Sequence, residues 1–173
     1  MPQPPIPLRR LHALGAIRTS LAHASALPGP ALAALQARAD QIEAALDEVS
    51  YELPEAVLHG DPQHGNALHH ARGAVLCDWD SAALGPPEWD LVTVEVHCRR
   101  FGYEPADYAR FAAHYGWDVS KWDGHPALRD LRELRMISTN SRKASHSLRT
   151  LPEVLRRIEV LHDARGVGGW SIL

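Results

Sequence analysis

The chain has 173 residues, of which 45% are hydrophobic and 23% are charged, and its net charge is -3. A chain of this length fits one domain, which buries enough apolar surface to fold without disulfides. Because a nucleic acid or an anionic membrane binds a clustered basic face, this charge balance argues against both as partners.

The first 30 residues contain six prolines and few periodic apolar positions. We expect an extended lead-in there, with room for a short helix within 8–21. From Pro30 to Ser50, apolar residues recur at spacings of three and four, which predicts an amphipathic helix. Pro54 prevents its continuation. The apolar positions of this helix are Leu32, Leu35, Ala39, Ile42, Leu46 and Val49.

Residues 56–80 have the pattern of short strands and loops. Apolar runs predict strands at Ala56–Leu58, Ala67–His69 and Ala74–Cys77, with the last of them buried. Arg72-Gly73 predicts the turn between the second strand and the third. Because binding residues concentrate on loops held by a rigid scaffold, we expect a site in this region.

The chain after Gly85-Pro86-Pro87 is predicted to be helical. Each segment has an apolar stripe at helical spacing, and three segments begin with proline, which is favoured at the first helical position. The last helix should end at Gly166. The expected fold class is therefore α+β, mainly helical, with a small β hairpin region. The predicted helices are Glu88–Arg99, Pro105–Tyr115, Pro126–Leu148 and Pro152–Arg165.

The loop between the first two predicted strands is strongly polar: His59-Gly60-Asp61-Pro62-Gln63-His64-Gly65-Asn66. Asp78 and Asp80 follow the third strand, so two segments each bring a carboxylate to the same edge of the β region. Mg2+ prefers oxygen ligands, commonly one or two protein carboxylates with substrate phosphates. An Asp and an Asn from different segments meet that requirement, and a further carboxylate can accept a proton from a hydroxyl group.

Taken together, these motifs resemble the catalytic loop and the metal-binding Asp of protein-kinase-like enzymes. Four residues separate Asp61 from Asn66, and the following strand ends in Asp78. His59-Gly60-Asp61, Asp78-Trp79-Asp80 and the segment 85–91 are similar to the aminoglycoside phosphotransferase and choline kinase branch, over about residues 50–140. The resemblance implies a kinase-like C-terminal lobe that transfers the γ-phosphoryl group of ATP to a hydroxyl of a small acceptor.

The resemblance also implies a role for individual residues. Asp61 matches the catalytic Asp that accepts the proton of the acceptor hydroxyl, and Asn66 and Asp78 match the two protein ligands of Mg2+. His59 is expected to order the loop and Asp90 to brace it. Two roles stay open for Asp80: it contacts a metal-bound water, or it fixes the end of the strand. One departure is Gln63-His64, where many relatives have His-Pro.

Some parts of such an enzyme have no counterpart in the sequence. The nucleotide is normally bound by a glycine-rich hairpin, a strand lysine and its glutamate partner. Here no lysine precedes Lys121, and residues 1–30 contain only Gly15 and Gly29. We therefore expect residues 1–30 to follow a missing N-terminal lobe and residues 31–173 to form the C-terminal lobe. The face on which the missing lobe would pack would favour a homo-oligomer. The nucleotide-binding residues stay unassigned.

Three other interpretations compete with this one. A zinc site would use His59, His64, His69 and His70, but their spacing does not place three of them on one face. A metallophosphatase would need further ligand loops downstream, and none follows. A catalytically inactive, kinase-like binding or interaction module is the serious alternative.

The acceptor stays open among aminoglycosides, choline-like amines, sugars and macrolides. Glu133 and Asp130 would suit a cationic acceptor, and a solvated helix face explains them equally well. Four tryptophans lie in the helical part, where such enzymes build acceptor pockets, but core packing is the better explanation for each of them. These tryptophans are Trp89, Trp117, Trp122 and Trp170.

Cys77 and Cys98 are too few for a disulfide framework, which favours reduced thiols. The start from Met1 to Pro7 lacks the apolar stretch of a signal peptide. No run approaches the roughly 20 apolar residues of a membrane span. We therefore expect a cytoplasmic protein with no membrane partner.

Overall fold

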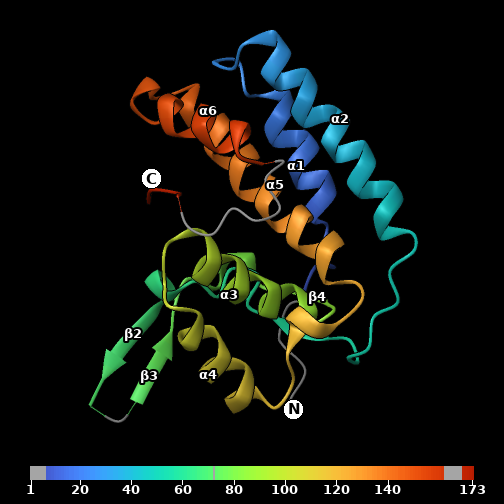
Figure 1. Ribbon diagram of the computed structural model, residues 1–173, viewed down its shortest axis with the longest axis vertical. Coiled ribbons are helices and arrows are strands. Elements are labelled where there is room, and N and C mark those ends of the chain that lie inside the picture. Colours follow the sequence, from blue (N-terminus) through green and yellow to red (C-terminus); the bar gives the residue numbers. More distant parts are fainter. Residues whose placement is uncertain (1–6, 72, 162–168) are drawn as a thin grey trace.

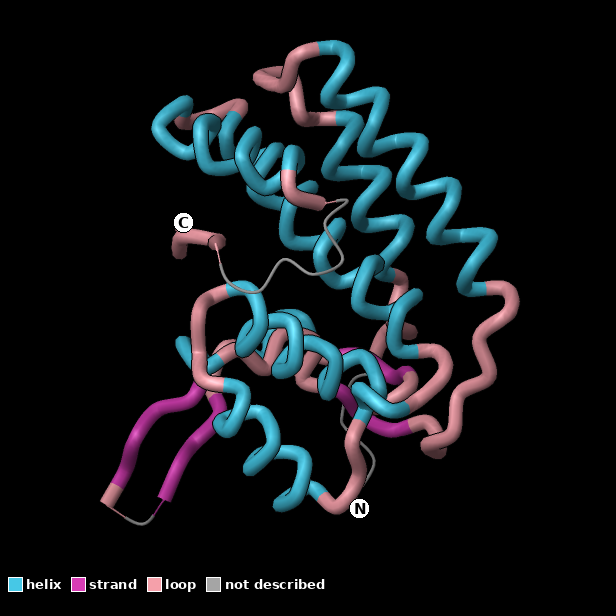
Figure 2. Tube along the Cα trace, viewed as in Figure 1, coloured by secondary structure: helices cyan, strands magenta, loops and turns pink. Residues whose placement is uncertain are grey.

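The structure is a computed structural model that describes residues 7–71, 73–161 and 169–173. Helices predominate and the strands are short and antiparallel, which confirms the expected class (Figure 1, Figure 2). No helix within these ranges is long and apolar enough to cross a membrane. In chain order the longer elements are α1 Ala13–Ala22, α2 Gly29–Leu46, β1 Ala56–Leu58, β2 Ala67–His70, β3 Gly73–Leu76, β4 Ala83–Gly85, α3 Glu88–Arg100, α4 Pro105–Tyr115, α5 His125–Ala144 and α6 Leu151–Glu159.

Helix α5 is the scaffold of the fold, because α1, α2, α3 and α6 all pack against it. Figure 1 shows α1 and α2 side by side along one part of α5, and α3 between α5 and the β2–β3 hairpin. Ile17, Leu35, Leu134 and Ile137 are fully buried in the main core that joins these helices. Each such side chain contributes about 1.5–3 kcal/mol relative to an exposed position.

A second, smaller core lies between α3, the short helix η3 (Val119–Lys121) and the start of α5. Trp122 is buried there, and its indole N–H donates to the carbonyl oxygen of Ser50 at 3.0 Å. Trp89 and Trp170 are buried in the main core, and Trp117 packs against the smaller one. Core packing therefore accounts for the tryptophans of the helical part.

The segment before α2 is more ordered than an extended lead-in. Helix α1 confirms the short helix expected within 8–21. Its residues Ala13, Ile17 and Leu21 are buried in the main core. Ahead of it, Leu11 N donates to Leu84 O at 2.8 Å, so the chain also runs beside β4. The proline count misled the prediction, because the three buried positions of α1 depend on packing against α5.

Most predicted helices appear within a few residues of their expected bounds. Proline occupies the first turn of α2, α4, α5 and α6, as its fixed φ favours. Helix α5 ends at Ala144 rather than near Leu148. The expected end of the last helix at Gly166 lies outside the described residues.

The strands form two separate antiparallel pairs, β1 with β4 and β2 with β3. The second pair confirms the predicted hairpin, although Arg72 of its turn lies outside the described residues. The prediction of a buried third strand is wrong, since Val75 and Leu76 are 52% and 44% exposed. Figure 1 shows the reason, because this hairpin projects away from the helices. Strand β4 was not predicted, because three residues are too few to give an alternating pattern.

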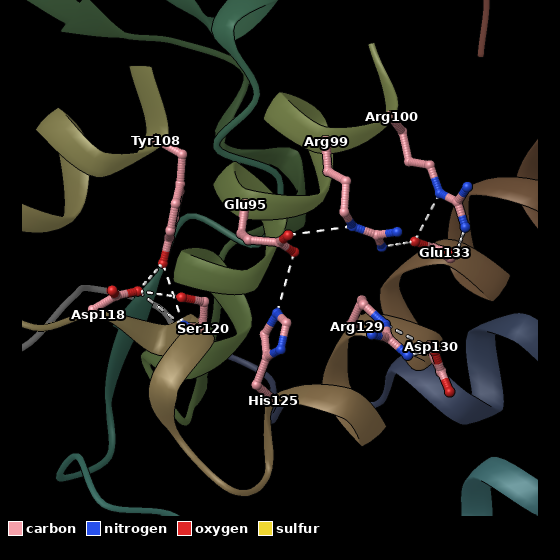
Figure 3. A network of polar contacts seen from close by, with 10 residues as sticks. All are labelled: Glu95, Arg99, Arg100, Tyr108, Asp118, Ser120, His125, Arg129, Asp130 and Glu133. Atoms are coloured by element: carbon pink, nitrogen blue, oxygen red, sulfur yellow. Dashed lines mark hydrogen bonds and ion pairs between the residues drawn. The ribbon is translucent and has the colours of Figure 1, made fainter. Parts of the chain in front are cut away.

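A buried network of charges joins α3 to α5 (Figure 3). Arg100 donates to both carboxylate oxygens of Glu133, from Nε at 2.9 Å and from Nη2 at 2.7 Å. Both side chains of this pair are 2% exposed. Arg99 also pairs with Glu133, and with Glu95 at 3.2 Å. Glu133 is therefore not on a solvated helix face, as one interpretation had it, but is bound by two arginines.

Replacing Glu133 by alanine should destabilise the protein by about 3–5 kcal/mol, because the guanidinium groups of Arg99 and Arg100 would lose the buried carboxylate that binds both of them. Urea unfolding followed by circular dichroism measures the change. Glu159→Ala, at an exposed position on α6, is the matched control and should change stability by less than about 0.5 kcal/mol. Equal midpoints for the two variants would show that the network does not hold α3 on α5.

Candidate active site

The polar loop that follows β1 is fastened to the first turn of α3. One carboxylate oxygen of Asp90 accepts from His59 N at 2.7 Å and the other from Gly60 N at 2.9 Å. The indole N–H of Trp89 donates to Gly60 O at 3.0 Å. Burial raises the pKa of Asp90, and the two amide hydrogen bonds act in the opposite direction. Three bonds from one helical turn thus fix the backbone just before Asp61.

His59 connects this loop to the end of β3. It is 3% exposed, and its Nε2 lies 2.9 Å from Cys77 O. Its Nδ1 accepts from Asp61 N at 3.3 Å, which leaves Nε2 to carry the proton that Cys77 O accepts. The imidazole ring also packs on Trp79, with ring centroids 4.6 Å apart.

Gly60 allows the two loops of the site to touch. Its φ is +84°, and a Cβ at this position would lie 2.2 Å from the carbonyl oxygen of Ser81. No other residue fits such a close approach of two backbones at a positive φ. Ser81 belongs to η2 (Trp79–Ser81), the short helix that follows Asp78.

The structure brings Asn66 and Asp78 next to each other. Cys77 N donates to Asn66 O at 2.9 Å, which places the residue after Cys77 beside Asn66. The Asn66 side chain donates through Nδ2 to Asp61 O at 2.9 Å, so its Oδ1 is the atom left for a cation. Asp78 is exposed and has a φ of 61°, a left-handed conformation that Asp and Asn tolerate better than most residues.

Asp80 lies in η2 and is exposed. Its carboxylate makes no hydrogen bond or ion pair with the described part of the chain, and both roles considered for it stay predictions. The histidines of the loop and hairpin are also dispersed, with His69 and His70 exposed on β2 and His59 buried. Among the described residues, no three His, Cys, Asp or Glu side chains are grouped to hold a metal ion.

The carboxylate of Asp61 is directed at α5, where Arg132 Nη2 donates to Oδ1. The Asp61 side chain is 33% exposed and that of Arg132 is 7% exposed, so solvent reaches the carboxylate but hardly the guanidinium. Sequence reasoning missed Arg132. An arginine follows each of Leu128, Leu131 and Leu134, and no sequence signal distinguishes the one that reaches the loop.

His97 of α3 lies near the Asp61–Arg132 pair. It is 6% exposed, and its ring centroid is 5.0 Å from that of Phe101. Burial, followed by the charge of Arg132, lowers the pKa of His97 to about 4, although Asp61 acts in the opposite direction. Its Nε2 is buried without a hydrogen-bond partner among the described residues. The imidazole beside Asp61 is therefore uncharged at neutral pH.

A model of the Phosphotransferase enzyme family matches residues 2–131, three quarters of the chain. The chain belongs to this family. The match includes every residue that the motifs singled out, from His59 to Asp90. No curated protein sequence matches the chain significantly.

Solved structures of kinases share the fold of this phosphotransferase-family chain. A choline/ethanolamine kinase family protein from Mesorhizobium loti has a TM-score of 0.67 at 17% identity, over 90% of this chain and 56% of that one. An amicoumacin kinase, in complex with AMP-PNP, Ca2+ and Ami, has a TM-score of 0.66 at 12% identity, over 99% and 55%. A spectinomycin phosphotransferase, in complex with ADP and spectinomycin, has a TM-score of 0.54 at 16% identity, over 92% and 55%.

These similarities confirm the kinase-like fold expected from the motifs. The chain spans little more than half the length of each of the three solved structures.

Replacing Asp90 by asparagine should destabilise the protein by about 1–3 kcal/mol, because one of the two loop amides would face an NH2 group instead of a carboxylate oxygen. Urea unfolding measures the loss, and faster hydrogen exchange at the His59 and Gly60 amides locates it. Asp47→Asn, at an exposed position after α2, is the matched control. If both variants unfold alike and exchange is unchanged, Asp90 does not hold the loop.

Acid should destabilise the protein partly through His97. Its folded-state pKa of about 4 lies below the ordinary value of 6.5, so the unfolded state binds more protons between these pH values. Stability must therefore fall as the pH drops from 6.5 towards 4. Between pH 7 and pH 5 the native protein should lose about 2 kcal/mol more than His97→Gln, measured by urea unfolding. Equal losses would mean that His97 is not buried uncharged.

Proposed function

We propose that this chain forms the catalytic half of an ATP-dependent phosphotransferase, which transfers the γ-phosphoryl group to a hydroxyl of a small acceptor in the cytoplasm. The observation that carries the proposal is the position of Asn66, whose side chain donates to the Asp61 backbone and whose own backbone pairs with Cys77, the residue before Asp78. Membership of the phosphotransferase family supports it, as do kinases of similar fold whose structures contain AMP-PNP or ADP.

Asp61 is the proposed general base. Its carboxylate is one-third exposed, so an acceptor hydroxyl can approach it from solvent. As the acceptor oxygen bonds to the γ-phosphorus and the bond from that phosphorus to the bridging oxygen breaks, ADP leaves and the hydroxyl proton moves to a carboxylate oxygen of Asp61. The fixed backbone before Asp61 keeps this carboxylate in place, which matters because positioning supplies much of such catalysis.

Asn66 and Asp78 are the proposed ligands of Mg2+. Their oxygens suit this hard cation, and two protein ligands leave positions for water and phosphate oxygens. The fit is supported by the orientation of Asn66, whose Nδ2 is occupied by Asp61 O and whose Oδ1 is left available. Bound Mg2+ would neutralise charge on the donor phosphates.

Three further residues have supporting roles in this proposal. His59 and Asp90 hold the loop through the hydrogen bonds described above, and Asp80, exposed two residues after Asp78, would contact a metal-bound water. No lysine precedes Lys121, so the residues that bind the nucleotide stay unassigned.

A second candidate is a kinase-like interaction module, including a homo-oligomer, without catalysis. The observation in its favour is the exposed apolar surface of the β2–β3 hairpin and η2. Leu68, Val75, Leu76 and Trp79 are each between 44% and 55% exposed there. The two candidates differ in that the interaction module transfers no phosphate.

Asp61→Asn should lower the rate of phosphoryl transfer by about 10²–10⁴-fold without changing the fold, because the amide cannot accept the proton. The measurement is Mg2+-dependent release of ADP by the protein, with a panel of hydroxylated acceptors. Asp123→Asn, at an exposed position before α5, is the matched control. Near-normal turnover by Asp61→Asn would refute the assignment of the base, and no transfer by the native protein would favour the interaction module.

A further inference from the structure

Two arginines of α5 border the proposed base. Arg132 donates to the Asp61 carboxylate, and Arg135 is near enough to Asp61 for their charges to attract. Residues three positions apart lie on the same face of a helix, so both guanidinium groups belong to the surface of α5 beside Asp61. An acceptor whose hydroxyl reaches Asp61 therefore meets this surface.

Elsewhere in the described ranges, arginines held inside the helical body are paired with carboxylates. Figure 3 shows two of these groups, Arg99 and Arg100 around Glu133, and Arg129 with Asp130. The pattern has a physical cause, because a guanidinium removed from water without an anion costs several kcal/mol. The further pairs are Arg38 with Asp130, and Arg156 and Arg157 with Glu153.

Arg135 departs from this pattern. Its side chain is partly buried and donates to the hydroxyl of Thr139, yet it forms no ion pair with any residue that the structure describes. Burial, and after it the charges of Arg132 and Arg142, lower the pKa of Arg135, and the charge of Asp61 acts in the opposite direction.

Unused hydrogen-bonding atoms lie in the same region. Arg132 Nε is buried and has no partner among the described residues, and the same holds for Nε2 of the nearby His97. Among the residues that the structure describes, Arg132 forms an ion pair with the carboxylate of Asp61 alone. The charge of Arg132 also acts on Asp90, but the Asp90 carboxylate already accepts from the amides of His59 and Gly60. His97 is uncharged near neutral pH, so what is left beside the base is an excess of unused donors on the arginines.

As an extension of the function proposed above, we infer that the acceptor is an anionic hydroxy compound, whose carboxylate or phosphate group is bound by Arg132 and Arg135 while its hydroxyl reaches Asp61. Arginine suits this task, because its planar fork of donors matches both anions. The same surface repels a cationic acceptor. Glu133 and Asp130, the acidic residues of α5 that a cation would need, are already bound by arginines.

The test measures binding to the 173-residue chain by calorimetry, without nucleotide and with EDTA. Four small probes each carry a hydroxyl group: glycerate, glycerol 3-phosphate, glycerol and choline. At least one of the two anions should bind at least tenfold more tightly than glycerol or choline, and the tighter of the two identifies the preferred group. Arg135→Gln should weaken that binding by about tenfold or more. Arg149→Gln, an exposed arginine after α5, should leave it unchanged.

Circular dichroism checks that each variant folds, and Arg135→Lys replaces Arg135→Gln if the latter does not. Lysine keeps the charge but loses the fork of donors, so weaker binding by this variant supports the inference as well.

Binding that is equal for all four probes would overturn the inference, as would anion binding that Arg135 variants do not weaken. Anion binding that depends on Arg135 in a protein that transfers no phosphate would refute the proposed function alone. Transfer that prefers glycerol or choline would refute the anionic acceptor alone.

Discussion

The geometry of the site depends on the two hydrogen bonds that the Asp90 carboxylate accepts from the amides of His59 and Gly60. These bonds fix the loop at the end of β1 relative to the first turn of α3. Helix α3 is in turn held on α5 by the buried charges around Glu133. The position of the loop is therefore determined by the packing of α3 on α5. The loop is thus held in position by the helices that pack together on α5.

Helix α5 serves two purposes along its length. One face supplies Leu131, Leu134 and Ile137 to the main core, and residues just off this face carry charge into partly buried positions. Glu133 is used within the fold, where it neutralises arginines of α3. Arg132 instead donates to the proposed base and Arg135 lies near it, so the same helix stabilises the body and shapes the surroundings of Asp61.

Much of the fold could be predicted from the sequence, because it depends on local patterns. The spacing of apolar residues predicts α2 and α4, and the Asp61–Asn66 interval with the following strand predicts that the polar loop lies beside the end of β3. Burial of β3 was predicted wrongly, since it depends on whether another element covers the hairpin. Arg132 and His97 could not be found, because only packing decides which side of a charged helix faces the loop.

The contact between Gly60 and Ser81 joins two backbones, whereas the surface beside Asp61 is made of side chains. Backbone contacts tolerate hardly any change, since every larger residue at Gly60 collides with a carbonyl oxygen. Side chains on a helix can be exchanged one at a time without moving the helix. If the proposed function holds, the architecture separates the chemistry from the choice of acceptor, and descendants of such a protein would acquire new substrates through single substitutions on α5 while their reaction stayed the same.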